Sequence, residues 1–348
     1  MMRLDPITRT KLARFRSIGR GYWSALILAA LMGLSLCAEL LVNSRALLVF
    51  YQGSLYFPTY GAVMPGTVFG EDYAYETDYR ALKQRFSEAG QGDWVVMPLI
   101  PYNPLEINAY EGEFAPHPPN AAREHYLGTD IAGRDVAARL VYGFRIAIWF
   151  SVALLLSTYV IGIALGCWMG YRGGWIDLGV QRLIEIWSNV PFLYVIMIVA
   201  SIVTPGFGLL VSLMVLFGWM GMTWYMRTAT YKEAARDYVL AARALGAGPW
   251  RIIGRHILPN TMSIIVTFIP FSIAGGITAL TALDYLGFGL PPPTPSWGEL
   301  LKQGTDRLDA PWIVSSVVAG LIAILVMVTF VGEAIREAFD PRRQVRYA

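Results

Sequence analysis

The stretch Tyr238–Asn260 reads YVLAARALGAGPWRIIGRHILPN and decides which fold the chain adopts. It predicts two short helices joined by a tight turn. We expect the first helix to cover Tyr231–Leu245, because Gly246 suits the left-handed position that follows a helix. We expect the second helix to begin at Pro249, whose missing N–H would have no helical partner in a first turn. The pattern is that of a helix–turn–helix loop.

The second helix of this loop is amphipathic. Trp250, Ile253 and Ile257 recur at helical spacing on one face, while Arg251 and Arg255 lie on another face. Such a helix suits either the lipid headgroups or a groove on a partner protein. The local pattern leaves both possibilities open.

Long apolar stretches lie on both sides of the loop. A bilayer core about 30 Å thick needs about 20 apolar residues in a helix, and six stretches are that long. We expect Pro259 to end the second loop helix and Asn260 to cap the span that follows. The six expected spans are Tyr22–Leu41, Ile146–Gly170, Ile184–Val203, Leu209–Met226, Met262–Leu283 and Trp312–Val331.

The composition agrees with an integral membrane protein. Of the 348 residues, 55% are hydrophobic and 15% are charged, whereas a soluble domain has about 25% charged residues. This balance excludes a disordered chain, a collagen-like repeat and a nucleic-acid-binding domain. Two cysteines and three scattered histidines exclude a disulfide scaffold and predict no bound metal.

Lysine and arginine residues predict the orientation in the membrane. They are concentrated before the first span, in the loop 227–260 and in the tail, which places both termini in the cytoplasm. We expect residues 1–21 to form a basic cytoplasmic N-terminus, 22–42 a retained first span rather than a cleaved signal peptide, and 333–348 a cytoplasmic tail. The basic residues at the two ends are Arg3, Arg9, Lys11, Arg14, Arg16, Arg20, Arg336, Arg342, Arg343 and Arg346.

We expect residues 43–144 to form a large insert on the opposite, outer side. The insert is rich in Tyr, Pro and Gly, and it holds twelve acidic residues between Glu71 and Asp135. Its Pro-containing segments predict turns and extended pieces rather than long helices. We expect a small folded lobe of mixed structure.

The six apolar cores lack ionisable side chains, and Glu39 and Glu185 lie only at their ends. This absence counts against an ion-coupled carrier, which keeps charges inside the membrane for coupling. It also counts against an intramembrane protease, which needs a paired nucleophile and base. No Gly-x-x-x-x-Gly-Lys-Ser/Thr loop is present, so we expect the energy source to lie on another chain.

The loop resembles the "EAA" loop of permeases in ABC importers. The resemblance rests on Ala241-Ala242, Gly246 and the HILPN stretch, and it departs at Leu240, where the family usually has Glu. The resemblance implies that the loop docks on an ATPase subunit. The residues assigned to this coupling role are Ala241, Ala242, Gly246, Pro249, Trp250, Ile253, His256, Ile257, Leu258 and Pro259.

Two further segments resemble the dipeptide, oligopeptide and nickel permeases. The first contains Thr129, Asp130, Arg134, Asp135 and Arg139, in which we expect an ion-paired collar with Asp135 and Arg139 paired four residues apart. These residues are interpreted as structural, with contact to cargo or a binding protein as the alternative.

The second segment is an outer loop between the fifth and sixth spans. Its Phe288, Pro292, Trp297 and Glu299 are expected on the side that meets a binding protein. Anchoring at the membrane interface is the alternative role for Phe288 and Trp297.

Together the resemblances imply an all-α membrane protein with six spans, a type I ABC-importer transmembrane domain. Its permease core would cover 145–332, with a periplasmic insert. Such a subunit lies in the bacterial inner membrane and works with a second homologous permease, ABC ATPase subunits and a periplasmic binding protein. It binds no cofactor, since ATP and Mg are held by the ATPase. The N-terminal segments and the insert most resemble a peptide-importer subgroup associated with microcin C uptake.

Several alternatives remain open from the residues. An importer of nickel or another small solute has the same fold. A membrane channel or scaffold that works without an ATPase is a second alternative. The spacing of the loop counts against it, because such a protein has no use for a docking loop. A membrane enzyme would use acids of the insert such as Glu106, Glu111 and Glu113, although solvated surface acids are commoner than an acid–base pair.

Overall fold

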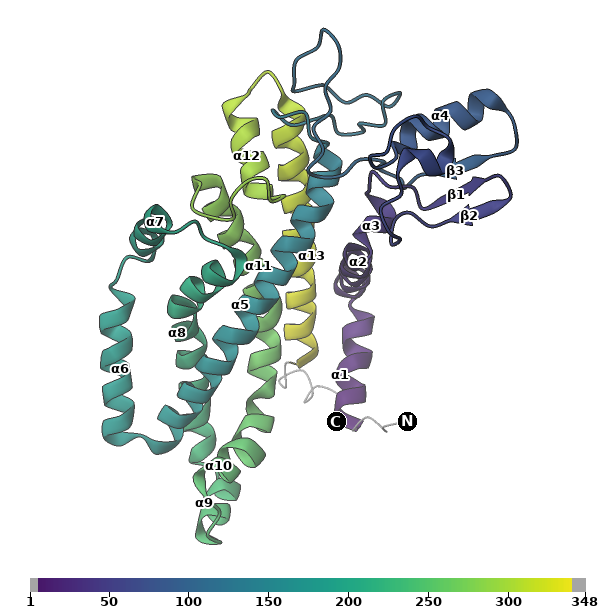
Figure 1. Ribbon diagram of the computed structural model, residues 1–348. Helices are drawn as coiled ribbons and strands as arrows, with labels where there is room; N and C mark the ends of the chain where they lie inside the picture. Colours follow the sequence, from purple (N-terminus) through teal and green to yellow (C-terminus); the bar gives the residue numbers. More distant parts are fainter. Residues whose placement is uncertain (1–5, 340–348) are drawn as a thin grey trace.

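Long apolar helices side by side dominate the computed structural model, which describes residues 6–339 (Figure 1). Arg3, Arg342, Arg343, Arg346 and the rest of the predicted tail beyond residue 339 lie outside the described residues. The expected fold class, an all-α membrane domain with an insert of mixed structure, agrees with the elements found. The α-helices up to α7 are α1 (Pro6–Ser17), α2 (Gly19–Leu36), α3 (Ala38–Leu41), α4 (Tyr79–Ala89), α5 (Val136–Arg172), α6 (Gly174–Ser188) and α7 (Phe192–Ile202).

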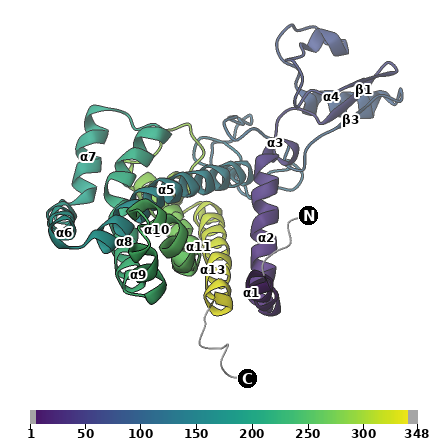
Figure 2. The same ribbon diagram turned by 90° about the horizontal axis from the view of Figure 1, so that it is seen from below.

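The second half of the chain is helical almost throughout. It contains α8 (Phe207–Ala234), α9 (Asp237–Ala244), α10 (Pro249–Ile252), a π-helical turn (Ile253–Ile257), α11 (Leu258–Leu286), α12 (Trp297–Asp306) and α13 (Pro311–Phe339). Seen from below, α1 and α2 flank the bundle beside α13, and α6 and α7 flank its other side (Figure 2). We call the end of the bundle that carries α9 and α10 the loop end, and the opposite end the lobe end.

Four described helices are long and apolar enough to cross a membrane, namely α5, α8, the run Pro249–Leu286 and α13. Two bent pairs raise the number to six if each pair is one span: Arg9–Ser17 with Gly19–Leu36, bent by 98°, and Gly174–Ser188 with Phe192–Ile202, bent by 65°. The 98° bend lies before Tyr22, where the first expected span begins, and that span is separately interrupted at Cys37, between α2 and α3. The expected third span, Ile184–Val203, is broken at Pro191, because proline disfavours helical backbone in the residue before it.

The insert folds into a small lobe with its own core (residues 46–97). Its three-stranded antiparallel sheet has the order β2–β1–β3, formed by Ser54–Tyr56, Leu48–Tyr51 and Trp94–Val96. A 3-10 turn (Gly66–Phe69) and α4 complete the lobe. The sequence pattern missed α4, whose start is capped by Asp78 and whose end has Gly90 in the left-handed region at φ +61°. Val49, Phe69, Leu82 and Phe86 are buried between the sheet and α4.

A stripe of glycines lets α5 and α8 approach closely. Gly162, Gly166 and Gly170 recur every four residues, and an added Cβ at Gly166 would lie 2.5 Å from the carbonyl oxygen of Thr223. A Cβ at Gly170 would lie equally close to the carbonyl oxygen of Arg227, at 2.5 Å. Small residues at such spacing drive helix association in membranes, where burial from water contributes nothing between helices.

We predict that Gly166→Leu separates α5 from α8 and destabilises the protein by about 1–3 kcal/mol or more, as overpacking does. The measurement is the thermal unfolding midpoint of the purified full chain in detergent. The matched control is Gly221→Leu in the partner helix α8, because a Cβ at Gly221 meets no atom within 4 Å. Equal midpoints for the two variants would contradict the close-packing interpretation.

Candidate functional site

The α9–α10 unit, which lies at the loop end, has the turn geometry that the sequence predicts. Gly246 has φ +82°, in the left-handed region, and no atom lies within 4 Å of the position of a Cβ. Its backbone conformation, rather than crowding, therefore demands glycine. Pro249 lies in the first turn of α10 after Gly248. Both expectations are confirmed.

Two boundaries of the unit differ from the prediction. The helix expected over Tyr231–Leu245 is split, because α8 ends at Ala234 and α9 starts at Asp237. Pro259 does not end a helix, since α10 continues into α11 through the π-helical turn Ile253–Ile257. The turn is wider by one residue, with Leu258 N–H donating to the carbonyl of Ile253, and it accommodates the proline that follows.

Asn260 does not cap a new helix. Its side-chain Nδ2 instead donates to the carbonyl of His256 at 2.6 Å and to the Tyr238 hydroxyl at 3.1 Å. The Tyr238 hydroxyl in turn donates to the Glu233 carboxylate at 2.5 Å. Asn260 therefore ties the start of α11 to α9 and to the end of α8.

The apolar face predicted for the second loop helix is divided between the interior and the surface. Ile257 is fully buried with Val239 and Ile252, and Ile253 packs against α5 and α11 at 7% exposure. These isoleucines therefore hold the unit onto its own chain, and of the three residues assigned to one face only Trp250 is exposed. Helical spacing identifies a face but not what covers it.

The exposed part of the unit is apolar and basic. Leu245 is 88% exposed, Trp250 69% and Leu240 47%, and Arg251 and Arg255 are exposed beside them. Of the other residues assigned to this loop, Ala241 and Pro259 are exposed, whereas Ala242, His256 and Leu258 are half-buried.

Trp250 also links the unit to α5. Its ring stacks on Trp168 with 4.7 Å between ring centroids, and the Arg172 guanidinium lies 4.9 Å from the centroid of the Trp168 ring. Arg243 of α9 lies over Tyr171, at 5.1 Å. Two of the unit's side chains therefore rest on the end of α5.

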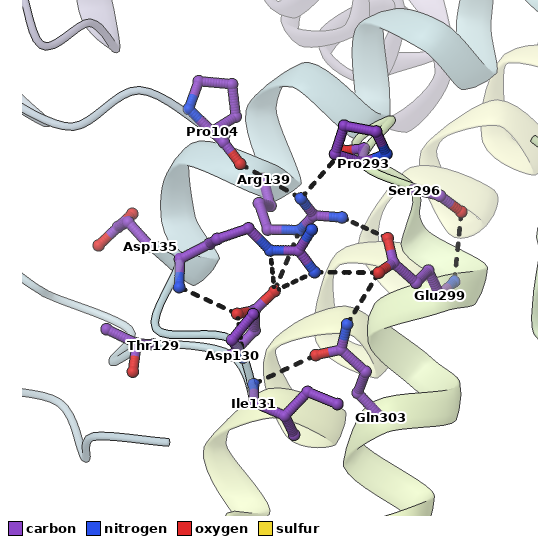
Figure 3. Close-up of polar contacts among 12 residues, drawn as sticks. Pro104, Thr129, Asp130, Ile131, Asp135, Arg139, Pro293, Ser296, Glu299 and Gln303 are labelled. Carbon is purple, nitrogen blue, oxygen red and sulfur yellow. Dashed lines mark hydrogen bonds and ion pairs between the residues drawn. The ribbon is translucent and has the colours of Figure 1, made fainter. Parts of the chain in front are cut away.

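At the lobe end, four charged residues form a second candidate site, the charge cluster: Asp130, Arg134, Arg139 and Glu299 (Figure 3). Arg134 contacts Asp130 at 2.7 Å and Glu299 at 3.0 Å. Arg139 is fully buried, lies 3.4 Å from Asp130 and also pairs with Glu299. The cluster joins the segment before α5 to the first turn of α12, which are more than 150 residues apart in the sequence.

Opposite charges in the cluster compensate the burial of Arg134. Burial alone lowers the pKa of the Arg134 guanidinium, but the carboxylates of Asp130 and Glu299 outweigh burial, so this pKa lies above its usual value. The Arg139 guanidinium also donates to the carbonyls of Pro104, Pro293 and Thr294. Buried cations are tolerated only when they are paired and hydrogen-bonded in this way.

Asp135 does not pair with Arg139, contrary to the prediction. Figure 3 draws it turned away from the arginines. Its carboxylate caps α5 by accepting from Ala138 N–H at 2.7 Å, and it contacts His125 Nδ1 at 2.8 Å. Thr129 is also outside the cluster, and its hydroxyl accepts from the His117 N–H at 2.7 Å. Asp135 takes the helix-cap position, where a carboxylate satisfies a free N–H of the first turn, and the fold brings His125 against its other oxygen.

The outer loop between α11 and α12 is more enclosed than expected. Trp297 is buried, packs over Gly143 and donates to the carbonyl of Leu140 at 2.8 Å. In this conformation it neither anchors at a membrane surface nor reaches a partner. Phe288 is half-buried, and Pro292 is exposed.

The sequence analysis missed Asp284, a buried acid near the end of α11. Its carboxylate accepts from Leu290 N–H at 2.7 Å and from the Ser296 hydroxyl at 2.5 Å, which shapes the whole outer loop. Asp284, Glu299 and Lys302 also line a cavity of about 340 Å³ that opens between this loop and the end of α7. The position of Asp284, directly before a Gly- and Pro-rich loop, was the sequence feature that pointed to its role.

We predict that Arg139→Met destabilises the protein by about 3–5 kcal/mol, because Glu299 and Asp130 lose a buried counter-charge. The measurement is thermal unfolding of the full chain in nanodiscs. The matched control is Arg182→Met, which removes an ion pair whose side chains are 70% and 49% exposed and costs at most about 1 kcal/mol. A midpoint for Arg139→Met as high as that of the control would refute a structural role for the cluster.

Comparison with known proteins identifies the family of the chain. The family model described as "Binding-protein-dependent transport system inner membrane component" matches residues 162–345. The Inner membrane ABC transporter permease protein YejE of Escherichia coli (strain K12) is 44% identical over 347 residues, covering 99% of this chain and 100% of the relative.

Two other relatives are similar as well. The Peptidoglycan transport system permease protein YejE of Agrobacterium fabrum (strain C58 / ATCC 33970) is 39% identical over 364 residues, with 98% of this chain and 95% of the relative covered. The Dipeptide transport system permease protein DppC of Lactococcus lactis subsp. cremoris (strain MG1363) is 34% identical over 221 residues, with 63% of this chain and 64% of the relative covered.

These relatives confirm the resemblance that the insert and the N-terminal segments indicate, which is to the E subunit of Yej importers. The matches run through the insert as well as the bundle, since they cover nearly the whole chain. The chain belongs to the inner-membrane components of binding-protein-dependent transport systems, as a non-catalytic permease subunit that spans the membrane several times.

Proposed function

We propose that this chain is one permease half of an ATP-driven importer of peptides, including microcin C-like peptide conjugates. A second, homologous permease would complete the pathway, a periplasmic binding protein would deliver the cargo, and ABC ATPase subunits would bind at the loop end. The loop end would then face the cytoplasm and the lobe end the periplasm. The observation that carries the proposal is the exposed α9–α10 unit, rigidly seated on two spans.

The surface of the unit suits a protein groove. Leu245 and Trp250 project from a short, fixed element, and exposed Arg251 and Arg255 flank them. Apolar anchors surrounded by charge are typical of protein interfaces. Leu240 replaces the usual glutamate with an exposed apolar side chain, so contact at that position would be apolar rather than ionic.

The α9–α10 unit is also connected to two membrane spans, so that a displacement of the unit would be passed on to them. The π turn makes α10 continuous with α11, and the Trp168–Trp250 stack joins it to α5. A displacement of the unit by closing ATPases would therefore move both spans as rigid bodies. At their far ends these spans meet the charge cluster and Asp284, where the outer loop is held.

The peptide cargo rests on the relatives' names, which include a dipeptide and a peptidoglycan transport system. Within the bundle, a cavity of about 280 Å³ between α5, α8 and α11 offers hydroxyl groups in an otherwise apolar lining. The Tyr159 and Ser272 hydroxyls lie 2.7 Å apart there. Hydroxyls of this kind can bind peptide groups without a net charge.

The alternative cargo is nickel or another small solute. Competition separates the two possibilities: uptake of a labelled peptide into proteoliposomes holding the whole transporter is measured with excess unlabelled peptide or excess Ni²⁺. Inhibition by peptide alone supports the proposal, and inhibition by Ni²⁺ alone contradicts it.

We predict that Gly246→Pro uncouples transport from ATP hydrolysis while the protein still inserts. Proline fixes φ near −65°, whereas Gly246 requires +82°, so the turn between α9 and α10 is rebuilt. In proteoliposomes with the partner subunits, peptide uptake should fall at least tenfold while ATP hydrolysis persists. Gly248→Ala is the matched control, because Gly248 has φ −71° and open space around it. Normal uptake by Gly246→Pro would overturn the coupling role.

We also predict that Leu245→Asp abolishes recovery of an ABC ATPase with this chain in a mild-detergent pull-down. A carboxylate at an apolar contact must be desolvated without a partner. Leu308→Asp is the matched control, since Leu308 is 82% exposed but lies between α12 and α13 at the lobe end. Mass spectrometry counts the ATPase per permease. Equal recovery of the ATPase with both variants would show that the docking surface lies outside the α9–α10 unit.

A further inference from the structure

One long segment of the lobe carries no charge. From Ala46 to Gly70 the chain contains no Asp, Glu, Lys, Arg or His, although twelve acids follow between Glu71 and Asp135. The segment includes β1, β2 and the turn after β2. An exposed surface without charged side chains is typical of a site that contacts a membrane or another protein.

The turn after β2 presents apolar side chains outward. Phe57 is 61% exposed, Tyr60 67% and Val63 58%, and Leu55 of β2 adjoins them with 54% exposed. The turn itself is well fixed. Thr59 Oγ1 donates to the carbonyl of Ala46 at 2.8 Å, and Gly61 N–H donates to the carbonyl of Phe57 at 3.1 Å.

The turn is held close to the outer ends of the first helices, because Thr59 bonds to Ala46, five residues after α3 ends. Partial desolvation and the charge of Glu39 raise the pKa of the Tyr60 hydroxyl, while the charge of Arg145 lowers it. Glu39 and Arg145 themselves pair at 2.7 Å. Arg145 directly precedes the apolar part of α5, which begins at Ile146. Figure 1 likewise draws the lobe beside α3 and α2.

The exposed turn is also continuous with an apolar surface of the first helices. Leu36 at the end of α2 is 56% exposed and Leu40 of α3 is 42% exposed, and both flank the Cys37–Glu39 region that Tyr60 approaches. In a chain that spans the membrane, exposed leucines at this position face lipid. The lobe surface therefore extends the lipid-facing surface outward.

We propose that the turn Leu55–Val63 is an interfacial anchor, which inserts Phe57, Tyr60 and Val63 into the boundary between headgroups and acyl chains of the leaflet on the lobe side. Aromatic and aliphatic side chains without charge bind this boundary, with the tyrosine hydroxyl towards the headgroups. The anchor holds the lobe down beside the first span. It needs only membrane insertion of this chain and does not depend on the proposed cargo or ATPase.

The test uses the full chain in nanodiscs of phosphatidylcholine and phosphatidylglycerol. Cys37→Ser and Cys167→Ala remove the native thiols, and single cysteines are then introduced as Phe57→Cys or Val63→Cys and labelled with a fluorophore. Lipids carrying a spin label near the headgroup quench the fluorophore on contact. The matched control is Phe114→Cys, because Phe114 is a 94% exposed aromatic residue of the insert outside the charge-free segment.

The proposal expects quenching at positions 57 and 63 to exceed quenching at position 114 by at least threefold. Equal quenching at all three positions overturns it. Shielding of positions 57 and 63 from a water-soluble quencher only after the binding protein is added also overturns it, because the surface would then be a protein-docking site. Using two positions guards against one variant that fails to fold, which gel filtration detects.

Discussion

The arrangement at the lobe end depends on one interaction, the pairing of two buried arginines with Asp130 and Glu299. Arg139 is fully buried, so it must find opposite charge and hydrogen-bond acceptors inside the protein. The partners come from the segment before α5, from the insert at Pro104 and from the loop before α12. Three regions far apart in the sequence therefore have to meet at one point, and the register of α5 against α12 follows.

The sequence predicted the features that local chemistry determines. Gly246 and Pro249 occupy the turn as their backbone preferences require, and the apolar stretches became long helices. Two prolines show where local chemistry is insufficient. Pro191 breaks a span, whereas Pro259 lies inside a continuous run, because a π turn absorbs the missing hydrogen bond only at Pro259. The sequence pattern around the two prolines does not distinguish these outcomes.

The candidate sites were predictable as segments but not as contacts. Asp130 and Arg134 pair as expected, yet Glu299, assigned to a different loop, completes the cluster. Asp135 contacts His125 and caps the start of α5 instead of pairing with Arg139. Ile253 and Ile257 face their own chain rather than a partner. In each case a choice between competing neighbours decided the outcome, and those neighbours are brought together only by the fold.

The fixed points of the molecule indicate where motion is possible. Asp135 caps α5 and contacts His125 of the insert, so the outer end of α5 is bound to the insert as well as to α12 through the charge cluster. If the lobe rests on lipid, this end of α5 is also fixed relative to the membrane. The α9–α10 unit is held at its base by Asn260, by Tyr238 and by the Trp168–Trp250 stack, whereas its tip is open, with Leu245 88% exposed. If an ATPase binds at that tip as proposed, a force there would pass through the base of the unit to α5 and α11, and these helices would tilt about their held outer ends.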